Sequence, residues 1–190
     1  MRPALTVIDM QKFFFNNQAR KEALPDLVAA VNDLIDWARK EEIPIYQVVT
    51  IHQADRSTWN LMMKNNDYAA LIEGTEEAEL VAGIEYDEDQ TLIKKTRQDT
   101  FIRTDFEEQL REEGIDTLLL AGVFTHGCVG RTAITAYQKD FQTVISNDAT
   151  FSDRPKHEEV MFEVITKEQE QRIMTNQELK ELVVDRRTRN

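Results

Sequence analysis

Residues 117–133 of this chain read TLLLAGVFTHGCVGRTA, and they carry most of the information on fold and function. Residues 117–123 form an almost unbroken apolar run after a Gly-Ile-Asp turn, which predicts a strand buried on both faces, as in a parallel sheet. Apolar residues then recur at helical spacing, at Val129, Ala133, Ala136 and Tyr137. The only cysteine, Cys128, is therefore expected where a buried strand passes into the N-terminus of a helix.

Two interpretations of Cys128 follow from this position. Unpaired backbone N–H groups and the positive end of the helix dipole favour a thiolate there, which would make Cys128 a nucleophile. A free cysteine is also among the most buried residue types and commonly packs as a small apolar side chain. Position alone leaves both interpretations open, so partners elsewhere in the chain have to decide.

Length and composition limit the class of protein. At 190 residues we expect one α/β domain over residues 1–190. A net charge of -12 and a pI near 4.8 argue against nucleic-acid and anionic-membrane partners, which require clustered Lys and Arg. One cysteine cannot form an intramolecular disulfide, no signal-type apolar region follows Met1, and no stretch approaches the roughly 20 apolar residues of a membrane span. We expect a cytoplasmic protein with no membrane partner.

The hydrophobic pattern predicts strands interleaved with helices. Strands are expected at 4–8, 45–51, 91–94, 117–123, 141–146 and 171–174, and helices at 25–42, 104–111, 129–137, 155–165 and 176–184. Residues 52–89 have only a weak pattern, typical of a functional loop or lid, and residues 147–150 are expected to form a loop. This alternation indicates a three-layer, doubly wound α/β fold with about six parallel strands and helices on both faces of the sheet.

Three reactive side chains follow the ends of predicted strands: Asp9 after the first, Lys95 after the third and Cys128 after the fourth. If the strand order reverses between the first and fourth strands, these ends converge at the switch point. Asp9 could then take the thiol proton, and Lys95 could stabilise both thiolate and carboxylate, while N–H groups of the turn at 122–128 receive an oxyanion. The alternative is that Asp9 only caps a turn and Lys95 lies in solvent.

Several separated motifs match one family in collinear order, from residue 4 to about residue 175. They are Val7-Ile8-Asp9-Met10-Gln11 with Phe14, Lys95-Thr96-Arg97 with Asp99 and Phe101, Gly122-Val123-Phe124-Thr125, Cys128-Val129, Thr132-Ala133 and Asn147-Asp148-Ala149. The chain thereby resembles the isochorismatase-like cysteine hydrolases, which include nicotinamidases and N-carbamoylsarcosine amidohydrolase. The resemblance implies Asp9, Lys95 and Cys128 as a catalytic triad and a thioester intermediate. It also implies a cis peptide between Val123 and Phe124 that helps aim the oxyanion-hole amides of Phe124 and Cys128.

Departures from the family pattern narrow the expected chemistry. Metal-binding nicotinamidases carry an Asp and several His residues after the second strand, whereas residues 50–59 offer only His52 and Asp55. We therefore predict no metal and no other cofactor. Isochorismatases proper have glycine where Cys128 stands, so a retained thiol favours a C–N substrate. Arg103 replaces the family's usual small residue before Thr104, which alters that wall of the pocket.

The walls of the pocket and the partners are the least specified features. Five side chains are pocket candidates by their positions: Phe14, His52, Trp59, Thr125 and His126. His52 could equally be a solvated loop residue. The Phe13–Phe15 cluster and Trp59 are more large apolar side chains than loops need, which predicts a homo-oligomer, a dimer or tetramer as is common in the family.

The expected function is a metal-free cysteine hydrolase that cleaves an amide or ureido-type C–N bond of a small molecule. One alternative is an isochorismatase-type vinyl-ether hydrolase in which Cys128 is a bystander. The other is a non-catalytic fold relative that acts as a binding subunit. Loss of a triad member would be the sign of the last alternative, and all three residue types are present.

Overall fold

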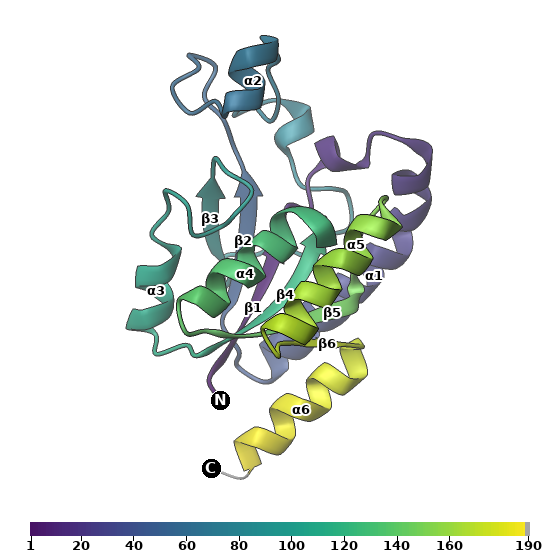
Figure 1. Ribbon diagram of the computed structural model, residues 1–190, viewed down its shortest axis with the longest axis vertical. Helices are drawn as coiled ribbons and strands as arrows, with labels where there is room; N and C mark the ends of the chain where they lie inside the picture. The colour runs from purple at the N-terminus through teal and green to yellow at the C-terminus, as the bar shows by residue number, and fades with distance from the viewer. Residues whose placement is uncertain (189–190) are drawn as a thin grey trace.

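The computed structural model describes residues 1–188, with side chains described through Arg186. Six strands form one all-parallel sheet in the order β3-β2-β1-β4-β5-β6 (Figure 1). Their bounds are β1 Pro3–Ile8, β2 Ile45–Thr50, β3 Thr91–Lys95, β4 Thr117–Val123, β5 Gln142–Phe151 and β6 Arg172–Met174. The order reverses between β1 and β4, which confirms the doubly wound sheet and makes the ends of these two strands a switch point.

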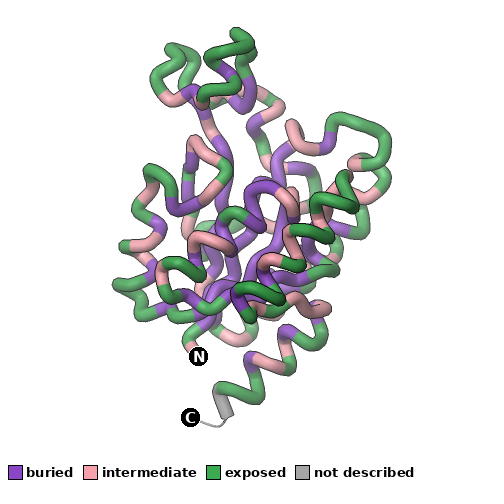
Figure 2. Tube along the Cα trace, viewed as in Figure 1, coloured by how far each residue is buried: buried purple, intermediate pink, exposed green. Residues whose placement is uncertain are grey.

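Helices cover both faces of this sheet, as expected. Their bounds are α1 Gln18–Lys40, α2 Leu61–Asn66, α3 Phe106–Glu112, α4 Gly130–Gln138, α5 Pro155–Glu163 and α6 Asn176–Thr188. Successive β4 residues point to opposite faces, so Leu119 packs with residues of α1 and α6 while Leu118 packs with residues of α3 and α4. Figure 2 shows the same three layers, because buried residues concentrate along the sheet and exposed ones on the outer helices and loops.

Helix α1 begins earlier than the sequence predicted. It starts at Gln18 rather than Pro25, and the side chain of Asn17 caps it by accepting a hydrogen bond from the Arg20 amide at 3.0 Å. Pro25 lies inside the helix and is exposed, so water can replace the hydrogen bond that its missing N–H leaves unmade. The prediction took the proline for the helix start because the first turns carry no buried residue.

The predicted loop at 147–150 is instead part of β5. The pairing of β4 with β5 shifts register between Leu120 and Gly122, after which Gly122 pairs with Thr150. Gly122 has a φ of +106°, and a Cβ there would lie 2.0 Å from the Ile8 carbonyl oxygen, so only glycine fits between β1 and β5. Ser146 holds the irregular part of β5, because its hydroxyl accepts from the Ala149 amide at 2.9 Å.

The connection from β2 to β3 contains more structure than its weak pattern indicated. It includes α2 and a 3-10 turn at Glu76–Ala78, and it returns over the end of β1. Gln11 fastens it there, because its buried side-chain amide donates to the carbonyl oxygens of Thr50 at 2.9 Å and Ala78 at 2.8 Å. The Val81 amide adds a bond to the Met10 carbonyl at 2.9 Å. None of the helices in the described chain has the length and apolarity that crossing a bilayer requires.

Candidate active site

Asp9 and Lys95 meet at the carboxyl edge of the sheet. Asp9 follows β1 with a φ of 57°, a left-handed conformation that aspartate tolerates better than most residues. Lys95 is the last residue of β3, and its Nζ lies 2.7 Å from Asp9 Oδ2. Both side chains are completely buried. Lys95 is therefore not a solvated lysine, and the carboxylate of Asp9 is held by an ion pair within the core.

Thr50 joins these two charges and was not found from the sequence. Strand β2 lies between β1 and β3, and Thr50 at its end pairs in register with Lys95. Its hydroxyl donates to Asp9 Oδ1 at 2.9 Å and accepts from Lys95 Nζ at 2.6 Å, so both carboxylate oxygens of Asp9 are engaged. The sequence could have pointed to Thr50 only by its position at the carboxyl end of β2, the strand that lies between β1 and β3.

Cys128 completes the group from the other side of the switch point. It lies in the turn Thr125–Val129 that precedes α4, and the Val123–Phe124 peptide before this turn is cis, as the resemblance implied. The side chain is buried, with 7% of its surface exposed. Its thiol lies close enough to Asp9 and Lys95 for both charges to act on its pKa. The structure thus brings together the three residues that follow separate strands in the sequence.

The protonation of Cys128 differs from the sequence-based expectation. Burial, aided by the Asp9 carboxylate, raises the pKa of the thiol to about 12, while Lys95 lowers it and only partly compensates. The expectation of a thiolate favoured by the helix end was therefore wrong for the free protein, because a helix terminus contributes at most about 2 kcal/mol even at a partly buried site. For Lys95, burial lowers the pKa, but the Asp9 and Cys128 interactions outweigh burial and raise it. The resting site holds a thiol beside a lysine ammonium.

His52 is a buried residue rather than a solvated loop residue, and its place in a substrate pocket stays a prediction. Only 1% of its surface is exposed, and its Nδ1 donates to the Thr58 carbonyl at 3.1 Å. Burial lowers the pKa of His52, and the charges of Arg97 and Lys95 lower it further against the opposing effect of Thr58. His52 is therefore a neutral imidazole near Lys95.

Trp59, by contrast, belongs to the interior of the β2–β3 connection. It packs with Met63 and Ala70, and its indole N–H donates to the Gln53 carbonyl at 3.0 Å. Phe15 is also buried in the main core. The expectation that both residues were surplus apolar surface was wrong, since Trp59 lies in a small core of the β2–β3 connection and Phe15 lies in the main core.

The three other pocket candidates surround the cis peptide. The Phe14 ring packs edge-on against the Phe124 ring at 5.8 Å, and the His126 ring stacks on the Phe124 ring at 5.7 Å. Thr125 is completely buried, and its hydroxyl has no hydrogen-bond partner among the described residues. The Phe124 ring therefore has the Phe14 and His126 rings as direct neighbours.

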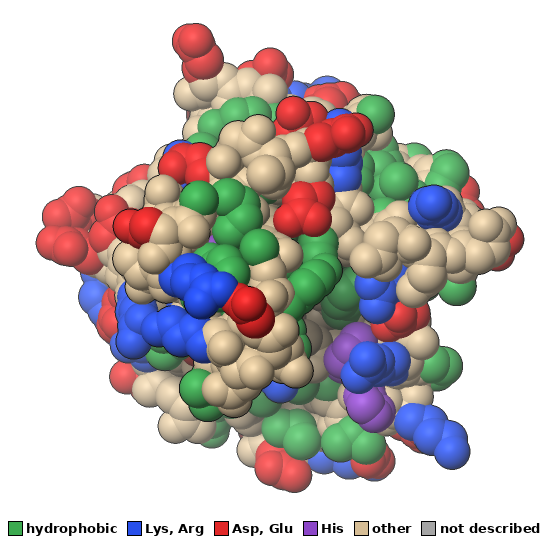
Figure 3. All heavy atoms as spheres, turned by 90° about the horizontal axis from the view of Figure 1, so that it is seen from above, with side chains coloured by type: hydrophobic (Ala, Val, Ile, Leu, Met, Phe, Trp, Pro, Cys, Tyr) green, Lys and Arg blue, Asp and Glu red, His purple; other side chains and the backbone are tan. Residues whose placement is uncertain are grey.

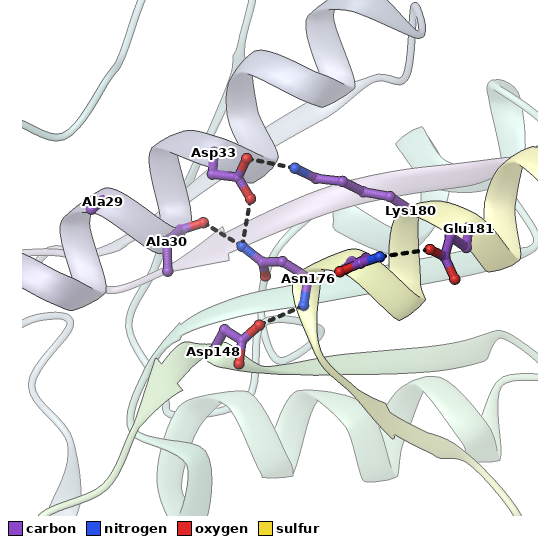
Figure 4. Close-up of a pocket in the computed structure, with 8 residues that line it drawn as sticks. Ala29, Ala30, Asp33, Asp148, Asn176, Lys180 and Glu181 are labelled. Atoms are coloured by element: carbon purple, nitrogen blue, oxygen red, sulfur yellow. Dashed lines mark hydrogen bonds and ion pairs between the residues drawn. The ribbon is translucent and has the colours of Figure 1, made fainter.

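Figure 3 looks onto the carboxyl ends of the strands and shows a narrow hollow near the middle of this face, with apolar side chains around it and histidines at one side. A cavity of about 560 Å³ lies elsewhere, between α1, α6 and the irregular part of β5 (Figure 4). A smaller one of about 300 Å³ lies beside Phe13 and Tyr68. Neither of these two cavities is lined by Asp9, Lys95 or Cys128.

The prediction of a metal-free site stays a prediction. Among residues 1–188, no group of three or more His, Cys, Asp and Glu side chains is arranged to hold a metal ion. His52 uses one ring nitrogen for the Thr58 carbonyl, and Asp55 uses a carboxylate oxygen for the amide and hydroxyl of Ser57. These potential metal-ligand atoms of His52 and Asp55 are thus used in hydrogen bonds within their own loop.

Comparison with known proteins identifies the family. Residues 3–178 match the family model described as the isochorismatase domain, and the chain belongs to the isochorismatase family of hydrolases. A probable inactive nicotinamidase of Arabidopsis thaliana is 32% identical over 161 residues, covering 80% of this chain and 82% of the relative. Enterobactin synthase component B of Escherichia coli is 28% identical over 84% of this chain, which spans only 56% of that relative.

The fold is shared with solved structures of the family. An isochorismatase family protein from Desulfovibrio vulgaris has a TM-score of 0.85 and 28% identity, with 96% of this chain and 98% of that chain covered. The resemblance read from separate sequence motifs is therefore confirmed over nearly the whole chain.

Proposed function

We propose that this chain is a cysteine hydrolase that cleaves an amide or ureido-type C–N bond of a small molecule. The observation that carries the proposal is the convergence of Asp9, Lys95 and Cys128 at one buried point, with Thr50 bridging Asp9 and Lys95. A carboxylate, an ammonium and a thiol in mutual contact are what covalent acyl transfer requires.

The reaction would proceed in two halves. The Asp9 carboxylate takes the thiol proton as Cys128 Sγ attacks the carbonyl carbon, and backbone amides of Phe124 and Cys128 stabilise the oxyanion. The C–N bond then breaks, and the proton passes from Asp9 to the leaving nitrogen. Water next attacks the thioester with Asp9 as base, which releases the acid and returns the proton to the sulfur.

The high pKa of Cys128 fits this order of events. The thiol is protonated in the free protein, and Asp9 is placed to remove its proton only when a carbonyl group is present. Lys95 stabilises the negative charge as it forms on sulfur. A resting thiol is also less exposed to oxidation than a thiolate.

The direct test is release of ammonia or an amine from a panel of small primary amides and ureido compounds. We expect turnover by the unaltered protein and a loss of at least about four powers of ten in Cys128→Ala, because the nucleophile is removed. An acyl adduct on Cys128, detected by mass spectrometry, would show covalent catalysis. Equal turnover by Cys128→Ala, confirmed as folded by circular dichroism, would contradict the proposal.

Two alternatives have an observation in their favour. Vinyl-ether hydrolysis with Cys128 as a bystander would suit a permanently protonated thiol, and it predicts that Cys128→Ala still cleaves an isochorismate-type vinyl ether. A non-catalytic role is favoured by the relative whose name calls it a probable inactive nicotinamidase. That role predicts no turnover of any compound in either panel.

Location and assembly belong to the proposal as well. We place the activity in the cytoplasm, which suits a buried free cysteine. We also retain self-association as a dimer or tetramer, although its basis has changed. Trp59 and Phe15 are buried, while Leu61 and Met62 of α2 are 73% and 63% exposed. Light scattering at micromolar concentration should give at least twice the monomer mass, and a monomer would reject this part of the proposal.

A further inference from the structure

The backbone of Phe124 holds the turn that carries Cys128. The Phe124 carbonyl oxygen accepts hydrogen bonds from the Gly127 amide at 2.8 Å and from the Val129 amide at 3.3 Å. Gly127 and Val129 are the residues directly before and after Cys128. A displacement of Phe124 would therefore move both neighbours of the reactive cysteine.

Three aromatic rings pack around the half-buried side chain of Phe124. The Phe14 ring meets it edge-on at 5.8 Å, the His126 ring stacks on it at 5.7 Å, and the Phe151 ring is tilted against it at 6.5 Å. Edge-on and offset-stacked arrangements are the favourable ones for aromatic pairs. The plane of the Phe124 ring is thus set by neighbours from three separate segments of the chain.

A fourth neighbour of the ring is a cation, Arg20. Its guanidinium carbon lies 4.5 Å from the centroid of the Phe124 ring, within the distance of about 6 Å at which a cation is attracted to an aromatic face. Arg20 belongs to the first turn of α1, which begins at Gln18 and is capped by Asn17 although it buries no apolar residue. This early start of α1 brings a guanidinium group onto the Phe124 ring.

Hydrogen bonds leave the Arg20 side chain little freedom. Its Nε and one Nη donate to Asp153 Oδ2 at 2.8 and 2.7 Å, and the other Nη donates to the Phe14 carbonyl and to Asn16 Oδ1, both at 3.3 Å. Only 17% of the Arg20 side chain and 15% of the Asp153 side chain are exposed. The planar guanidinium is thereby fixed between the start of α1 and the loop that precedes α5 (Figure 1).

The partner of Arg20 is a charged carboxylate. Burial alone would raise the pKa of Asp153, but the Arg20 guanidinium outweighs burial and lowers it, and the charges of Arg154 and His126 act in the same direction. An ion pair with both groups largely removed from water is stronger than an exposed pair. Its simplest role is to tie two segments together, but a simple tie does not require the guanidinium to lie on the Phe124 ring.

We propose that Arg20 is a positioning residue for this reaction, which stacks on Phe124 and so fixes the oxyanion-hole amides of Phe124 and Cys128. The inference rests on the proposed hydrolysis and adds a residue that does not itself touch the reacting atoms. The negative oxygen forms only as the carbonyl carbon is attacked, so a displaced hole slows the chemical step and leaves substrate binding unchanged. Loss of Arg20 should therefore lower kcat without raising KM.

The test is a double-mutant cycle, measured with the amide of the panel that the unaltered protein hydrolyses fastest. Arg20→Gln and Phe124→Leu should each lower kcat by about tenfold with KM little changed, since a cation–aromatic contact or its aromatic face is lost. The double variant should be no slower than the slower single one, because Arg20 acts through the ring. Lys21→Gln, which removes the neighbouring exposed cation of α1, should keep full kcat.

Two outcomes of this cycle would overturn the proposal. One is a folded Arg20→Gln variant with unchanged kcat, and the other is a double variant slowed by the product of the two single effects, about a hundredfold. Asp153→Asn extends the test, because it keeps Arg20 and removes the charge that anchors it, and it should lower kcat by about threefold. If Arg20→Gln fails to fold and Asp153→Asn retains full kcat, Arg20 is only a structural tie and the proposal is wrong.

An adduct that needs no turnover separates this inference from the hydrolytic function. Cys128 Sγ adds to the carbonyl carbon of propionaldehyde and the thiol proton passes to the aldehyde oxygen, which then lies in the same hole. Carbon NMR of the labelled aldehyde carbon gives the dissociation constant of this hemithioacetal. We expect the constant to rise by about tenfold in Arg20→Gln and to stay unchanged in Lys21→Gln.

The two measurements together show which proposal fails. If no amide is hydrolysed but the dissociation constants follow this pattern, the hydrolytic function fails and the role of Arg20 at the thiol stands. If amides are hydrolysed and Arg20→Gln changes neither kcat nor the dissociation constant, the role of Arg20 fails and the hydrolytic function stands. An unaltered protein that hydrolyses no amide and forms no adduct would contradict both.

Discussion

Two regions of this molecule use the same chemical groups in opposite settings. At the triad, Lys95 pairs with Asp9 with no exposure of either side chain, and a threonine hydroxyl bridges them. In the groove between α1 and α6, Lys180 pairs with Asp33 with 23% and 51% of the side chains exposed, and the amide of Asn176 donates to the same carboxylate (Figure 4). The groove is a cavity of about 560 Å³, and none of the triad residues lines it.

The two environments differ in how much an ion pair contributes to the free energy of folding. An exposed ion pair contributes about 0–1 kcal/mol, because water solvates both ions almost as well. Breaking a buried pair costs about 3–5 kcal/mol, because one charge is left without a partner. In the groove both side-chain polar atoms of Asn176 have partners, and its backbone N–H, the first of α6, donates to the Asp148 carboxylate. At the triad, burial leaves a thiol whose proton Asp9 can take, and this is the reactive element.

After loss of the Cys128 nucleophile itself, the largest effects should come from its two charged partners. Asp9→Asn keeps the shape and removes the base, and Lys95→Met removes the charge that stabilises sulfur, so each should lower kcat by about two to three powers of ten. The double variant should be little worse than either single one, because the residues act as a unit. Rates within a few-fold of the unaltered protein, in variants with native circular dichroism, would return both residues to structural roles.

Alkylation of Cys128 tests the effect of burial on the thiol. Because its pKa is raised to about 12, iodoacetamide at pH 8 should react at least about a hundredfold more slowly than with the same chain in denaturant. The rate should rise about tenfold per pH unit beyond pH 10. Labelling as fast as in the unfolded chain would mean that the thiolate is already formed.

The same pKa shift predicts a pH dependence of stability. The pKa of Cys128 is higher in the folded protein than in the unfolded chain, so its contribution is complete below about pH 8.5 and is lost as pH rises toward 12. The free energy of unfolding should therefore fall more steeply above pH 9 than in Cys128→Ser. Parallel curves for the two proteins in urea titrations would contradict this.

Thr50 should have a smaller effect, because it positions the charges without reacting. Thr50→Val removes the hydroxyl that donates to Asp9 and accepts from Lys95. We expect kcat to fall by about ten- to a hundredfold with KM little changed. Thr50→Ser keeps the hydroxyl and should recover most of the rate. A valine variant as active as the serine variant would show that the bridge has no part in the reaction.

The sequence was most informative where one property of the chain decides the structure. The apolar runs of β1 and β4 identified buried parallel strands, and reactive residues directly after them identified Asp9 and Cys128. Thr50 was missed because its role depends on β2 lying between β1 and β3, and threonine is common at strand ends. The pKa of Cys128 was misjudged because burial depends on residues from many elements, whereas a helix end is visible locally.

The start of α1 and the length of β5 were missed for related reasons. Residues 18–24 bury little surface, so no apolar stripe marks the first turns of α1. The irregular part of β5 is held by its pairing with Gly122 of β4, and the asparagine and aspartate at 147 and 148 look like turn residues when read alone. The start of α1 is set by its N-cap, and the length of β5 is set by its pairing across the sheet.

The smallest effect on activity should come from the groove, and it completes the comparison. Asn176→Ala removes bonds to the Ala30 carbonyl, the Asp33 carboxylate and the Ser146 hydroxyl, and since Asn176 is buried we expect a loss of about 1–3 kcal/mol in urea unfolding. Lys180→Met breaks only the exposed pair and should cost at most about 1 kcal/mol. Activity per folded molecule should stay within a factor of two in both variants, because neither contacts the triad. A tenfold fall in kcat for Asn176→Ala at full folding would mean that β5 transmits changes in the groove to the Cys128 turn, and the two regions would then have to be treated as one site.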